Sequence, residues 1–596
     1  MAVVKSLATG FTAWATKQRS PGYSRIYAEN DTESLPSPAF RKRKSSRWLP
    51  SLSPRMLLAV VASILLFSCI LFTVSHDRVS TSESSPLQDG LAPLPAVEKG
   101  GPRRLRVIVP ADGPSPDLCK MLMSGLVSGY PSPVIVNWGR DFHKSPGWFG
   151  GSHLGKIDGA LDFLDAITSD QAPEDERLGP DDLVIVVDAY DLWFQLPPSL
   201  LIRRYMAQNY AADQRIRKDW GADSQTWFSS NGNTTEFVPK QSIIISTQKK
   251  CWPDPSLGSD PHCDKLPQST AREDLYGSHT DEDPLQFHDV RPRYVNSGSF
   301  MGPVGDMRRM LRRAQEKVEE KRAAGIDIFS DQGIFAEIFG EQEMWRTSKR
   351  EHRRSGKISE AENAEIMLEA AHFDYGVGLD YIQDLFTPTV FEEDDGEYIV
   401  LSNKTALEVA ANERVIIPPR VEGVPEDMLE TRIPLSEAGI NTKLGWADVP
   451  LYTDFWTTSV PVIVHHNAHR NGLKGLRLKD WWKNNWFFPY LRHLMEFQAR
   501  PRALEPLFKI MGQDGAKDLV YWAPASDANK RKPRIFNKEK LKKEGLPESN
   551  WNPLCTNEGN EEWWKEVFQD GKGSVDPESS DASDKNTPPE TEDGQR

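Results

Sequence analysis

Short runs of apolar, β-branched residues bounded by turn-forming residues recur early in the folded part of the chain. Arg106–Pro110 (RVIVP), Pro133–Trp138 (PVIVNW) and Leu183–Val187 (LVIVV) are of this kind. Runs of this length without polar alternation are typical of strands that are buried on both faces of a sheet. Between them, Leu154–Ile167 (LGKIDGALDFLDAI) has helical spacing. The alternation of strand and helix predicts an α/β unit with a mainly parallel sheet.

The later part of the chain has a weaker pattern. Met307–Arg322 (MRRMLRRAQEKVEEKR) predicts a charged amphipathic helix, and Asp331–Phe339 predicts a shorter one. Trp481–Phe497 is rich in aromatic residues and has helical spacing, so we expect a helix there that completes the folded domain. Residues around Glu341–Ala364 and Phe391–Pro425 have little periodicity, so we expect loops or peripheral elements there.

One segment differs from this soluble pattern. Met56–Val74 (MLLAVVASILLFSCILFTV) contains no charged residue and is close to the ~20 apolar residues that cross a bilayer. The basic residues before it are Arg41, Lys42, Arg43, Lys44, Arg47 and Arg55. Only Arg78 follows closely, so the positive-inside rule predicts a cytosolic N-terminus and a single-pass type II membrane protein. A cleaved signal peptide and a buried soluble helix are the alternatives.

Composition divides the remainder into further regions. Residues 1–55 are rich in Ser, Pro and Arg and predict a disordered cytosolic tail, and residues 75–102 predict a stem. We expect the α/β domain over residues 103–500 and a C-terminal extension packed on it over residues 501–569. Residues 570–596 are acidic and rich in Ser and Pro, which predicts a disordered tail.

The charge of the chain argues against nucleic acid as a partner. The formal net charge is −14, and the eight acidic and three basic residues of Asp570–Arg596 contribute −5 of it. Binding to phosphate backbones needs clustered Lys and Arg instead. The mixed composition also excludes a protein with many membrane spans.

The cysteines outside the apolar segment are even in number and suit two disulfides in an oxidising compartment. They are Cys119, Cys251, Cys263 and Cys555. Cys251 and Cys263 enclose a short loop of Pro, Asp and Gly residues and form the preferred pair, which leaves Cys119 for Cys555. Three connectivities remain open. A zinc site is less favoured, because the sequence contains no C-x-x-C pair.

The clearest chemical signal is a pair of carboxylates at the end of a buried strand. Asp188 directly follows Leu183–Val187, and Asp191 follows it in the sequence VDAYD. In open α/β sheets, ligands bind beyond the carboxyl ends of the strands. Two hard oxygen ligands in that place suit Mn²⁺ or Mg²⁺ on a nucleotide diphosphate. A pair of solvated turn or N-cap aspartates is the alternative.

Five segments together resemble a known family. They are DLVIVVDAYDLWFQ (Asp182–Gln195), FGGSHLGK (Phe149–Lys156), YVNSGSFMG (Tyr294–Gly302), FSDQGIF (Phe329–Phe335) and VIVHHN (Val462–Asn467). The first resembles the D-x-x-D metal motif of GT-A glycosyltransferases. The set is most similar to the N-terminal glycosyltransferase domain of procollagen lysyl hydroxylases, and covers roughly Leu105 to Trp486.

The resemblance implies a GT-A fold, a Rossmann-like mixed sheet flanked by helices. It further implies transfer of a hexose from a UDP-sugar, dependent on Mn²⁺ (or Mg²⁺). Asp188, Asp191 and His465 would hold the metal, which would stabilise the charge on the departing UDP.

The resemblance also suggests roles for five other residues. Asp331 would lie near the transferred sugar and Asn296 would orient its hydroxyls, so both are catalytic candidates. Lys156 and Lys474 are candidates for phosphate contacts, and Ser297 for a sugar contact. The alternatives are exposed helix lysines, a turn at the Asn-Ser-Gly sequence, and a helix N-cap at Asp331.

Two features depart from the family pattern. The His-x-Asn-Gly motif has two registers here, His465 to Ala468 and His469 to Gly472. We prefer His465, because a metal ligand needs the rigid strand behind it. We expect no counterpart of the hydroxylase domains in the residues after Trp486, so collagen is not implied as the acceptor.

The expected location and partners follow from these hypotheses. We expect a Golgi membrane protein, with the endoplasmic reticulum as the alternative, that acts on a lumenal glycan or protein. Asn233 and Asn403 begin N-x-Thr triplets, which agree with exposure to the lumen.

Two other functions are alternatives to the glycosyltransferase hypothesis. His372 and Asp374 form an H-x-D that, with a later His such as His465, could make the 2-His-1-carboxylate triad of an Fe(II)/2-oxoglutarate oxygenase. The α/β pattern speaks against the β-barrel that such triads occupy. The other rival is a non-catalytic lumenal scaffold or sugar-binding protein, against which the presence of both Asp188 and Asp191 argues.

Overall fold

The computed structural model describes residues 91–97, 99–142, 151–221, 237–356, 359–513 and 515–576. The predicted tail, the apolar segment 56–74, most of the stem, Asn233 and residues 577–596 lie outside these ranges, so the hypotheses about them stay predictions. No helix in the described ranges is long and apolar enough to cross a membrane. Every element below belongs to the unit that includes Pro93–Arg596.

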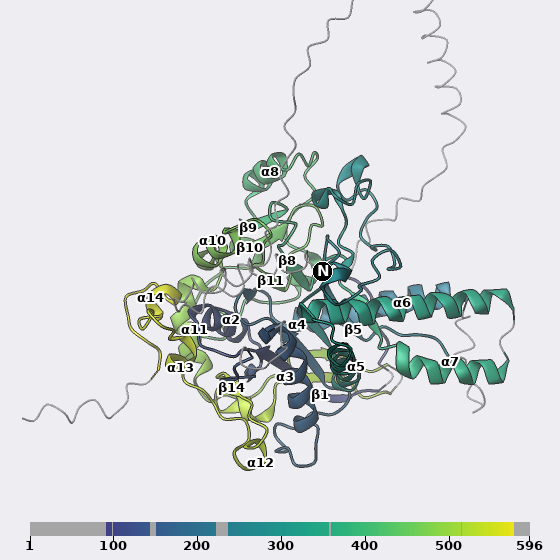
Figure 1. Ribbon diagram of the computed structural model, residues 1–596. Coiled ribbons are helices and arrows are strands. Elements are labelled where there is room, and N and C mark those ends of the chain that lie inside the picture. The colour runs from purple at the N-terminus through teal and green to yellow at the C-terminus, as the bar shows by residue number, and fades with distance from the viewer. Residues whose placement is uncertain are drawn as a thin grey trace, which may run out of the picture. The chain divides into compact units, whose positions relative to one another are not determined.

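A mixed sheet of nine strands forms the centre of this unit, with helices on its faces (Figure 1). Its main path is β12 (Phe508–Ile510), β13 (Leu519–Trp522), β1 (Gly101–Pro110), β3 (Leu183–Val187), β6 (Tyr294–Pro303), β5 (Ile243–Gln248) and β7 (Val377–Leu379). The other two strands are β2 (Val134–Val136), beside β1, and β14 (Arg534–Ile535), beside β2. β1 is parallel to β2 and β3, whereas β6 runs antiparallel to β3 and β5. The predicted α/β class is therefore confirmed as a mixed sheet flanked by helices.

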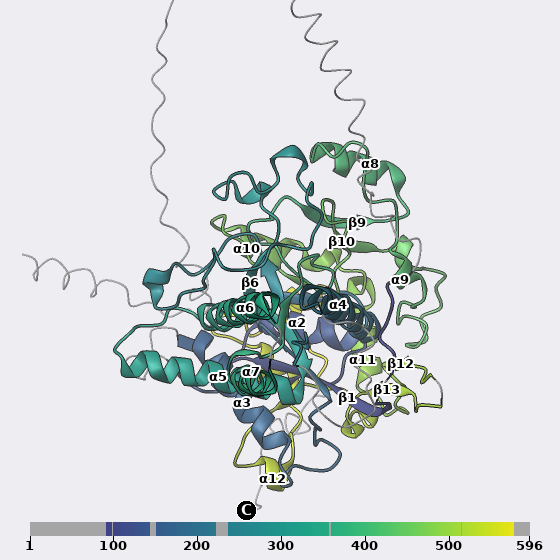
Figure 2. The ribbon, with the colours of Figure 1, turned by 90° about the vertical axis from the view of Figure 1, so that its right-hand side faces the viewer.

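β3 contributes to two separate hydrophobic cores, because successive side chains of a strand point to opposite faces. The helices of one face are α3 (Gly151–Ile167), α5 (Val304–Ala323) and α6 (Asp331–Ser355), which lie close together in Figure 2. Val184 and Val186 pack in the core under these helices. Ile185 and Val187 pack on the opposite side, in the core that includes residues of α2 (Pro116–Val127) and α4 (Pro198–Asp219). Burial on both faces explains the uninterrupted apolar run.

A smaller three-stranded sheet joins the end of β3 to distant parts of the chain. Its order is β4 (Leu192–Phe194), β11 (Ile463–His465) and β8 (Phe386–Pro388). β11 runs antiparallel to β4 and parallel to β8. A two-stranded sheet is formed by β9 (Gly396–Val400) and β10 (Pro450–Asp454), and α8 (Lys404–Glu413) lies above it at the top of Figure 1. α9 (Glu426–Leu429) follows α8 in the chain.

The region around Glu341–Ala364 is mostly helical, which the sequence pattern did not show. α6 continues to Ser355, and α7 (Glu360–Phe373) follows it. Trp345 packs with Ile366 and Ala370 in a small core of their own. The apolar contact between these helices is narrow and the rest of their surface is charged, so the periodic signal is weak.

The C-terminal residues take part in the central sheet rather than only covering it. The remaining helices are α10 (Leu473–Asp480), α11 (Leu491–Gln498), α12 (Leu541–Glu544), α13 (Trp551–Cys555) and α14 (Trp564–Val567). The parallel pairing of β13 with β1 brings residues beyond 501 into the sheet. Arg492 pairs with Asp570, and Asp576 accepts hydrogen bonds from the backbone N–H groups of Trp551 and Asn552. These contacts hold residues 570–576, which composition assigns to the acidic tail, against the body.

The preferred disulfide pairing is confirmed. Cys119 of α2 is bonded to Cys555 at the end of α13, with their Cα atoms 5.5 Å apart across 436 residues of sequence. Cys251 is bonded to Cys263, which closes the short loop. The first bond fastens the C-terminal segment to α2, beside the main core.

Candidate metal centre

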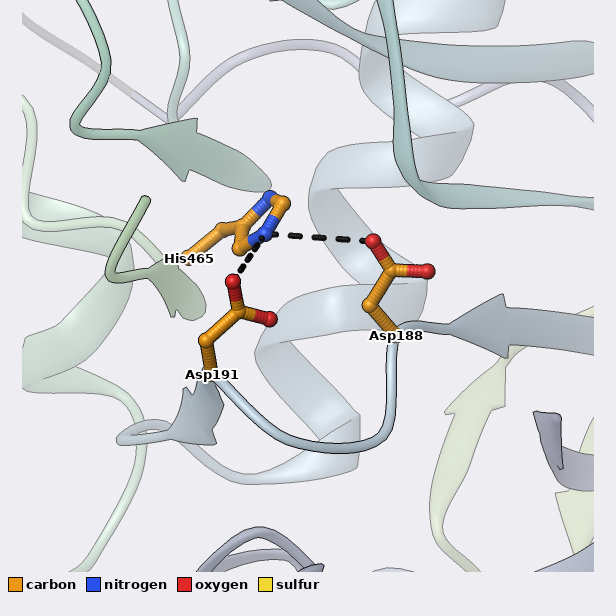
Figure 3. Close-up of side chains that lie close together, drawn as sticks. All are labelled: Asp188, Asp191 and His465. Carbon is orange, nitrogen blue, oxygen red and sulfur yellow. Dashed lines mark ion pairs between the residues drawn. The ribbon is translucent and has the colours of Figure 1, made fainter. Parts of the chain in front are cut away.

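Asp188 and Asp191 lie at the two ends of the short turn that joins the central sheet to the smaller sheet. β3 ends at Val187, and β4 begins at Leu192. The backbone N–H of Asp188 donates to the carbonyl oxygen of Gly298 on β6, 2.9 Å away, so the start of the turn stays attached to the sheet. Both carboxylates point toward the same space in Figure 3. Asp191 is buried, and the Asp188 side chain keeps 28% of its surface exposed.

His465 reaches the two carboxylates from β11. His465 pairs opposite Leu192 of β4, which places it beside Asp191. His465 and Asp191 are 274 positions apart in the sequence (465 − 191). Its Nε2 lies 3.2 Å from Asp191 Oδ2 and 3.8 Å from Asp188 Oδ2 (Figure 3). One ligand atom from each residue lies within 4.8 Å of the other two. Two carboxylates and one imidazole so placed can hold a divalent ion such as Mn²⁺.

Gly298 makes room for the His465 ring. A Cβ atom built on Gly298 would overlap the Nδ1 and Cε1 atoms of that ring. The glycine of the Asn-Ser-Gly sequence is therefore needed because the histidine ring packs close to it. The sequence alone suggested only a turn for this glycine.

Two lysines pair with the two aspartates from separate helices. Lys156 of α3 lies 2.7 Å from Asp188 Oδ1 and 2.8 Å from Asp331 Oδ2. Its ammonium also donates to the carbonyl oxygen of Ser297, 3.1 Å away. Lys474 of α10 lies 2.7 Å from Asp191 Oδ2. Lys156 is buried, so the alternative of an exposed helix lysine does not apply to it.

The charges in this centre support one another. Burial acts to raise the pKa of Asp191, but His465 and Lys474 outweigh burial and hold that pKa well below its usual value. Burial acts to lower the pKa of Lys156, but the carboxylates of Asp188 and Asp331 outweigh it and raise that pKa. Asp191 is therefore ionised and Lys156 is protonated at neutral pH.

Asp331 belongs to the same constellation but does not cap its helix. α6 begins at Asp331, and the N-cap is Ser330, whose hydroxyl accepts from the backbone N–H of Gln332 at 3.1 Å. The interpretation of Asp331 as an N-cap is wrong, because the residue before it has that function. Asp331 is buried next to Lys156, and its Oδ1 lies 4.0 Å from Nδ1 of His153.

Asn296 and Ser297 make contacts within the protein. The Asn296 amide donates to Gln248 Oε1 at 2.9 Å, and its oxygen accepts from the backbone N–H of Gly298 at 3.1 Å. The Asn-Ser-Gly sequence lies within β6, so the alternative of a turn there is wrong. Both residues are buried beside the centre, and Ser297 contributes its carbonyl oxygen to Lys156.

A pocket opens next to Asp188, at the carboxyl ends of the first three strands. It is lined by Pro110 at the end of β1, Ala111 and Asp112 after it, Asn137 after β2, Asp188, Ala189 and Tyr190 after β3, and Phe142, Ser152, His153 and Lys156 from the segment before and within α3. The Tyr190 hydroxyl lies 3.2 Å from Asp112 Oδ1 and donates to the carbonyl oxygen of Gly113 at 3.0 Å. This is the edge of an α/β sheet at which ligands bind. Asp112 and Tyr190 were not predicted, although each follows the end of a buried strand within three residues.

Other predicted residues lie apart from this centre. The Nδ1 atom of His469 lies 2.6 Å from Glu393 Oε1, so the structure brings His465, and not His469, to the two aspartates. Asp374 pairs with Arg346, and His372 lies in the last turn of α7. Neither joins His465 in a group that could hold a metal within the described part of the chain, so the proposed Fe(II) triad is wrong. Asn403 is exposed and caps α8, with its side chain accepting from the N–H of Ala406.

A second acidic group was missed altogether. Glu392, Asp395 and Asp454 are buried together at the β9–β10 sheet. The sequence signal was the run FEEDD, in a region that we expected to be peripheral.

No protein-family model matches this chain, and a search of the curated proteins finds no match.

Proposed function

We propose that this protein is a metal-dependent glycosyltransferase of the GT-A type, which moves a hexose from a UDP-sugar to a lumenal glycan or protein. The proposal includes a single membrane-spanning helix at residues 56–74 and a Golgi location, with the endoplasmic reticulum as the alternative. It rests on the resemblance to the glycosyltransferase domain of procollagen lysyl hydroxylases and on the chemistry of the Asp188 centre.

The observation that carries the proposal is the meeting of Asp188, Asp191 and His465 beside a pocket at the carboxyl edge of the sheet. The three residues come from two strand ends that are far apart in sequence. Their donor set of two carboxylates and one imidazole suits Mn²⁺, and leaves coordination positions for a ligand. When bound, the metal would supply Lewis-acid stabilisation of the charge on the departing UDP.

The lysines supply the complementary charge for a diphosphate. Lys156 faces the pocket and contacts Asp188, whereas Lys474 contacts Asp191 on the other side of the centre. A diphosphate at Asp188 and Asp191 would lie within reach of both ammonium groups. Charge-assisted contacts of this kind are about twice as strong as neutral hydrogen bonds, so they would orient the donor as well as bind it.

Asp331 is the carboxylate best placed to act near the sugar. It is buried, lies at the start of α6 and is held by Lys156, which also holds Asp188. The shared lysine fixes the distance between the metal ligand and Asp331. We assign to Asp331 a contact with the transferred sugar, and to Asn296 the support of Gly298, whose lack of a side chain admits His465.

The test is metal-dependent release of UDP. The full-length protein is incubated with a panel of UDP-sugars in the presence of Mn²⁺ or of EDTA, and free UDP is measured. We expect release from at least one donor with Mn²⁺ only, and a loss of roughly 100-fold or more in Asp188→Ala and Asp191→Asn. Asp170→Asn, which changes a fully exposed aspartate, serves as the matched control and should keep the parent rate.

Each other outcome has a defined meaning. If no donor is bound or turned over and both variants behave like the parent, the glycosyltransferase proposal fails. Binding of UDP and Mn²⁺ without turnover would favour the non-catalytic sugar-binding alternative.

A further inference from the structure

A second group of carboxylates lies away from the Asp188 centre and is sealed from solvent. Glu392 and Asp395 are in the segment between β8 and β9, and Asp454 is the last residue of β10. Their relative exposures are 0%, 4% and 0%. One oxygen from each carboxylate lies within 4.8 Å of the other two.

Part of this group is already engaged by the protein. Glu392 Oε1 accepts from the side-chain amide of Gln383 at 2.6 Å, and Asp395 Oδ2 pairs with Lys249 at 2.5 Å. Asp454 Oδ1 accepts from the backbone N–H groups of Trp456 and Thr457. One oxygen of each of these three carboxylates is therefore held in place.

Two of the other oxygens have no partner. Within the described residues, Glu392 Oε2 and Asp454 Oδ2 are buried and accept no hydrogen bond. A buried carboxylate oxygen without a partner costs free energy, because it has given up its hydration without replacing it. Two of them in one cluster indicate a ligand that the protein chain itself does not provide.

The charge of the cluster also calls for a cation. When all three carboxylates are ionised they carry −3, and the buried ammonium of Lys249 returns +1, which leaves −2 in a buried site.

We propose that Glu392, Asp395 and Asp454 bind a Ca²⁺ ion. Carboxylate oxygens are hard ligands, and Ca²⁺ binds them at about 2.3–2.6 Å, so two oxygens on opposite sides of the ion are about 4.6–5.2 Å apart. The ligand atoms of this cluster lie within 4.8 Å of one another, so all three can reach one Ca²⁺ ion. Mg²⁺ usually keeps several waters and is seldom held by protein carboxylates alone, so a buried site of this kind suits it less. Ca²⁺ also supplies the two positive charges that neutralise the site.

The ion would brace the segment that holds the end of β11. Thr389 donates its backbone N–H to the carbonyl oxygen of His465 at 2.9 Å, and Val390 donates to Asn467 Oδ1 at 3.0 Å. Both residues lie just before Glu392. A cation that ties Glu392 and Asp395 to Asp454 therefore fixes the segment against β10, and with it the backbone around His465. The inference is independent of the glycosyltransferase proposal, because it concerns binding and stability alone.

The experiment measures Ca²⁺ binding and thermal unfolding of the full-length protein after removal of metals with EDTA. We expect Ca²⁺ to bind in equilibrium dialysis and to raise the melting temperature by roughly 3 to 5 °C at a hundredfold excess over Kd. Glu392→Gln and Asp454→Asn each keep the oxygen that is already hydrogen-bonded and remove the charge, so both should lose this shift. In EDTA, they should melt at or above the temperature of the parent, because they relieve the repulsion.

The matched control is Asp394→Asn, in the same acidic run but exposed and paired with Arg470. It should keep the Ca²⁺ shift. To separate the two centres, the measurement is repeated in Asp188→Ala, where the Ca²⁺ shift should persist. The proposal is overturned if the parent binds no Ca²⁺ and melts at the same temperature with and without it. It is equally overturned if the shift survives in both Glu392→Gln and Asp454→Asn.

Discussion

The Asp188 centre and the Glu392 cluster contain similar groups in opposite surroundings. Each has carboxylates within 4.8 Å of one another and at least one lysine against them. The Asp188 centre adds a histidine and borders a pocket at the edge of the sheet. The Glu392 cluster has oxygen ligands alone and is closed on every side. A ligand can therefore reach the Asp188 centre from solvent, whereas the Glu392 cluster is closed to exchange with solvent.

The difference shows why acidic residues alone do not define a function. What distinguishes the two sites is access and the charge of the neighbouring groups. Lys156 and Lys474 lie on two sides of the Asp188 centre and can serve an incoming anion. Lys249 is fully buried against Asp395 and can only balance charge within the protein. The predictions below test this contrast in order of decreasing effect.

The largest effect is expected from removal of the buried ammonium of the closed cluster. Lys249→Met leaves Asp395 buried without its cation, and breaking a buried ion pair in this way costs about 3–5 kcal/mol. We expect that loss in the free energy of unfolding, measured in EDTA by chemical denaturation. Lys474→Met at the open centre is the control and should lose much less, because Asp191 keeps His465. Equal losses in the two variants would remove the contrast between the sites.

The next effect separates the two histidine registers. His465→Ala removes a ligand and should weaken Mn²⁺ binding by about 100-fold, as measured by electron paramagnetic resonance titration. His469→Ala breaks only the pair with Glu393 and should leave Mn²⁺ affinity close to that of the parent. The reverse ranking would move the metal ligand to the second register.

A smaller effect is expected at Gly298. In Gly298→Ala the new methyl group forces the His465 ring away from Asp191, so Mn²⁺ affinity should fall by about 10-fold. Gly475→Ala adds a methyl group into open space on α10 and should leave the affinity unchanged. If Gly298→Ala binds Mn²⁺ like the parent, the close packing of the ring is not needed for the site.

Asp380 is buried next to the carboxylate of Asp384. Burial, followed by the neighbouring carboxylate of Asp384, raises the pKa of Asp380 to about 7. The folded chain keeps this proton at pH values at which the unfolded chain, with a carboxyl pKa near 3.8, has released it. The stability that the proton provides is therefore present below about pH 4 and lost as the pH rises to about 7.

Asp380→Asn should remove this dependence. Its free energy of unfolding is expected to change less between pH 4 and 7 than that of the parent, by up to about 1.4 kcal/mol per pH unit. Denaturant unfolding at several pH values measures the difference, with Asp170→Asn as the exposed control. Parallel curves for the parent and Asp380→Asn would show that the pair does not hold a proton in the folded state.

The strands and helices with strong patterns were predictable, and those with mixed patterns were not. LVIVV becomes β3 because five consecutive apolar residues can be buried only in a strand covered on both faces. The region around Glu341–Ala364 escaped prediction because its helices share only a narrow apolar contact around Trp345 and Ile366. β12, β13 and β14 are two to four residues long, too short for any pattern to show.

Within the Asp188 centre, the residue types were evident before their arrangement. Asp188 was predictable, since it directly follows β3, and Asp191 follows within one turn. The pairing of Lys156 with both Asp188 and Asp331 depends on the packing of α3 against the sheet and α6, which no local pattern encodes. The Glu392 cluster was missed because its third member, Asp454, comes from another strand.

The sequence by itself determined the α/β class, the disulfide preference and the candidate ligands, because each depends on local periodicity or on residue chemistry. Only the tertiary structure showed that His465, and not His469, lies beside the two aspartates, by placing β11 beside β4 in a register that sets His465 opposite Leu192. It alone showed that a second group of carboxylates is buried. Strand register and burial arise from contacts between residues far apart in the chain, and the energy of such contacts is not visible in any short segment.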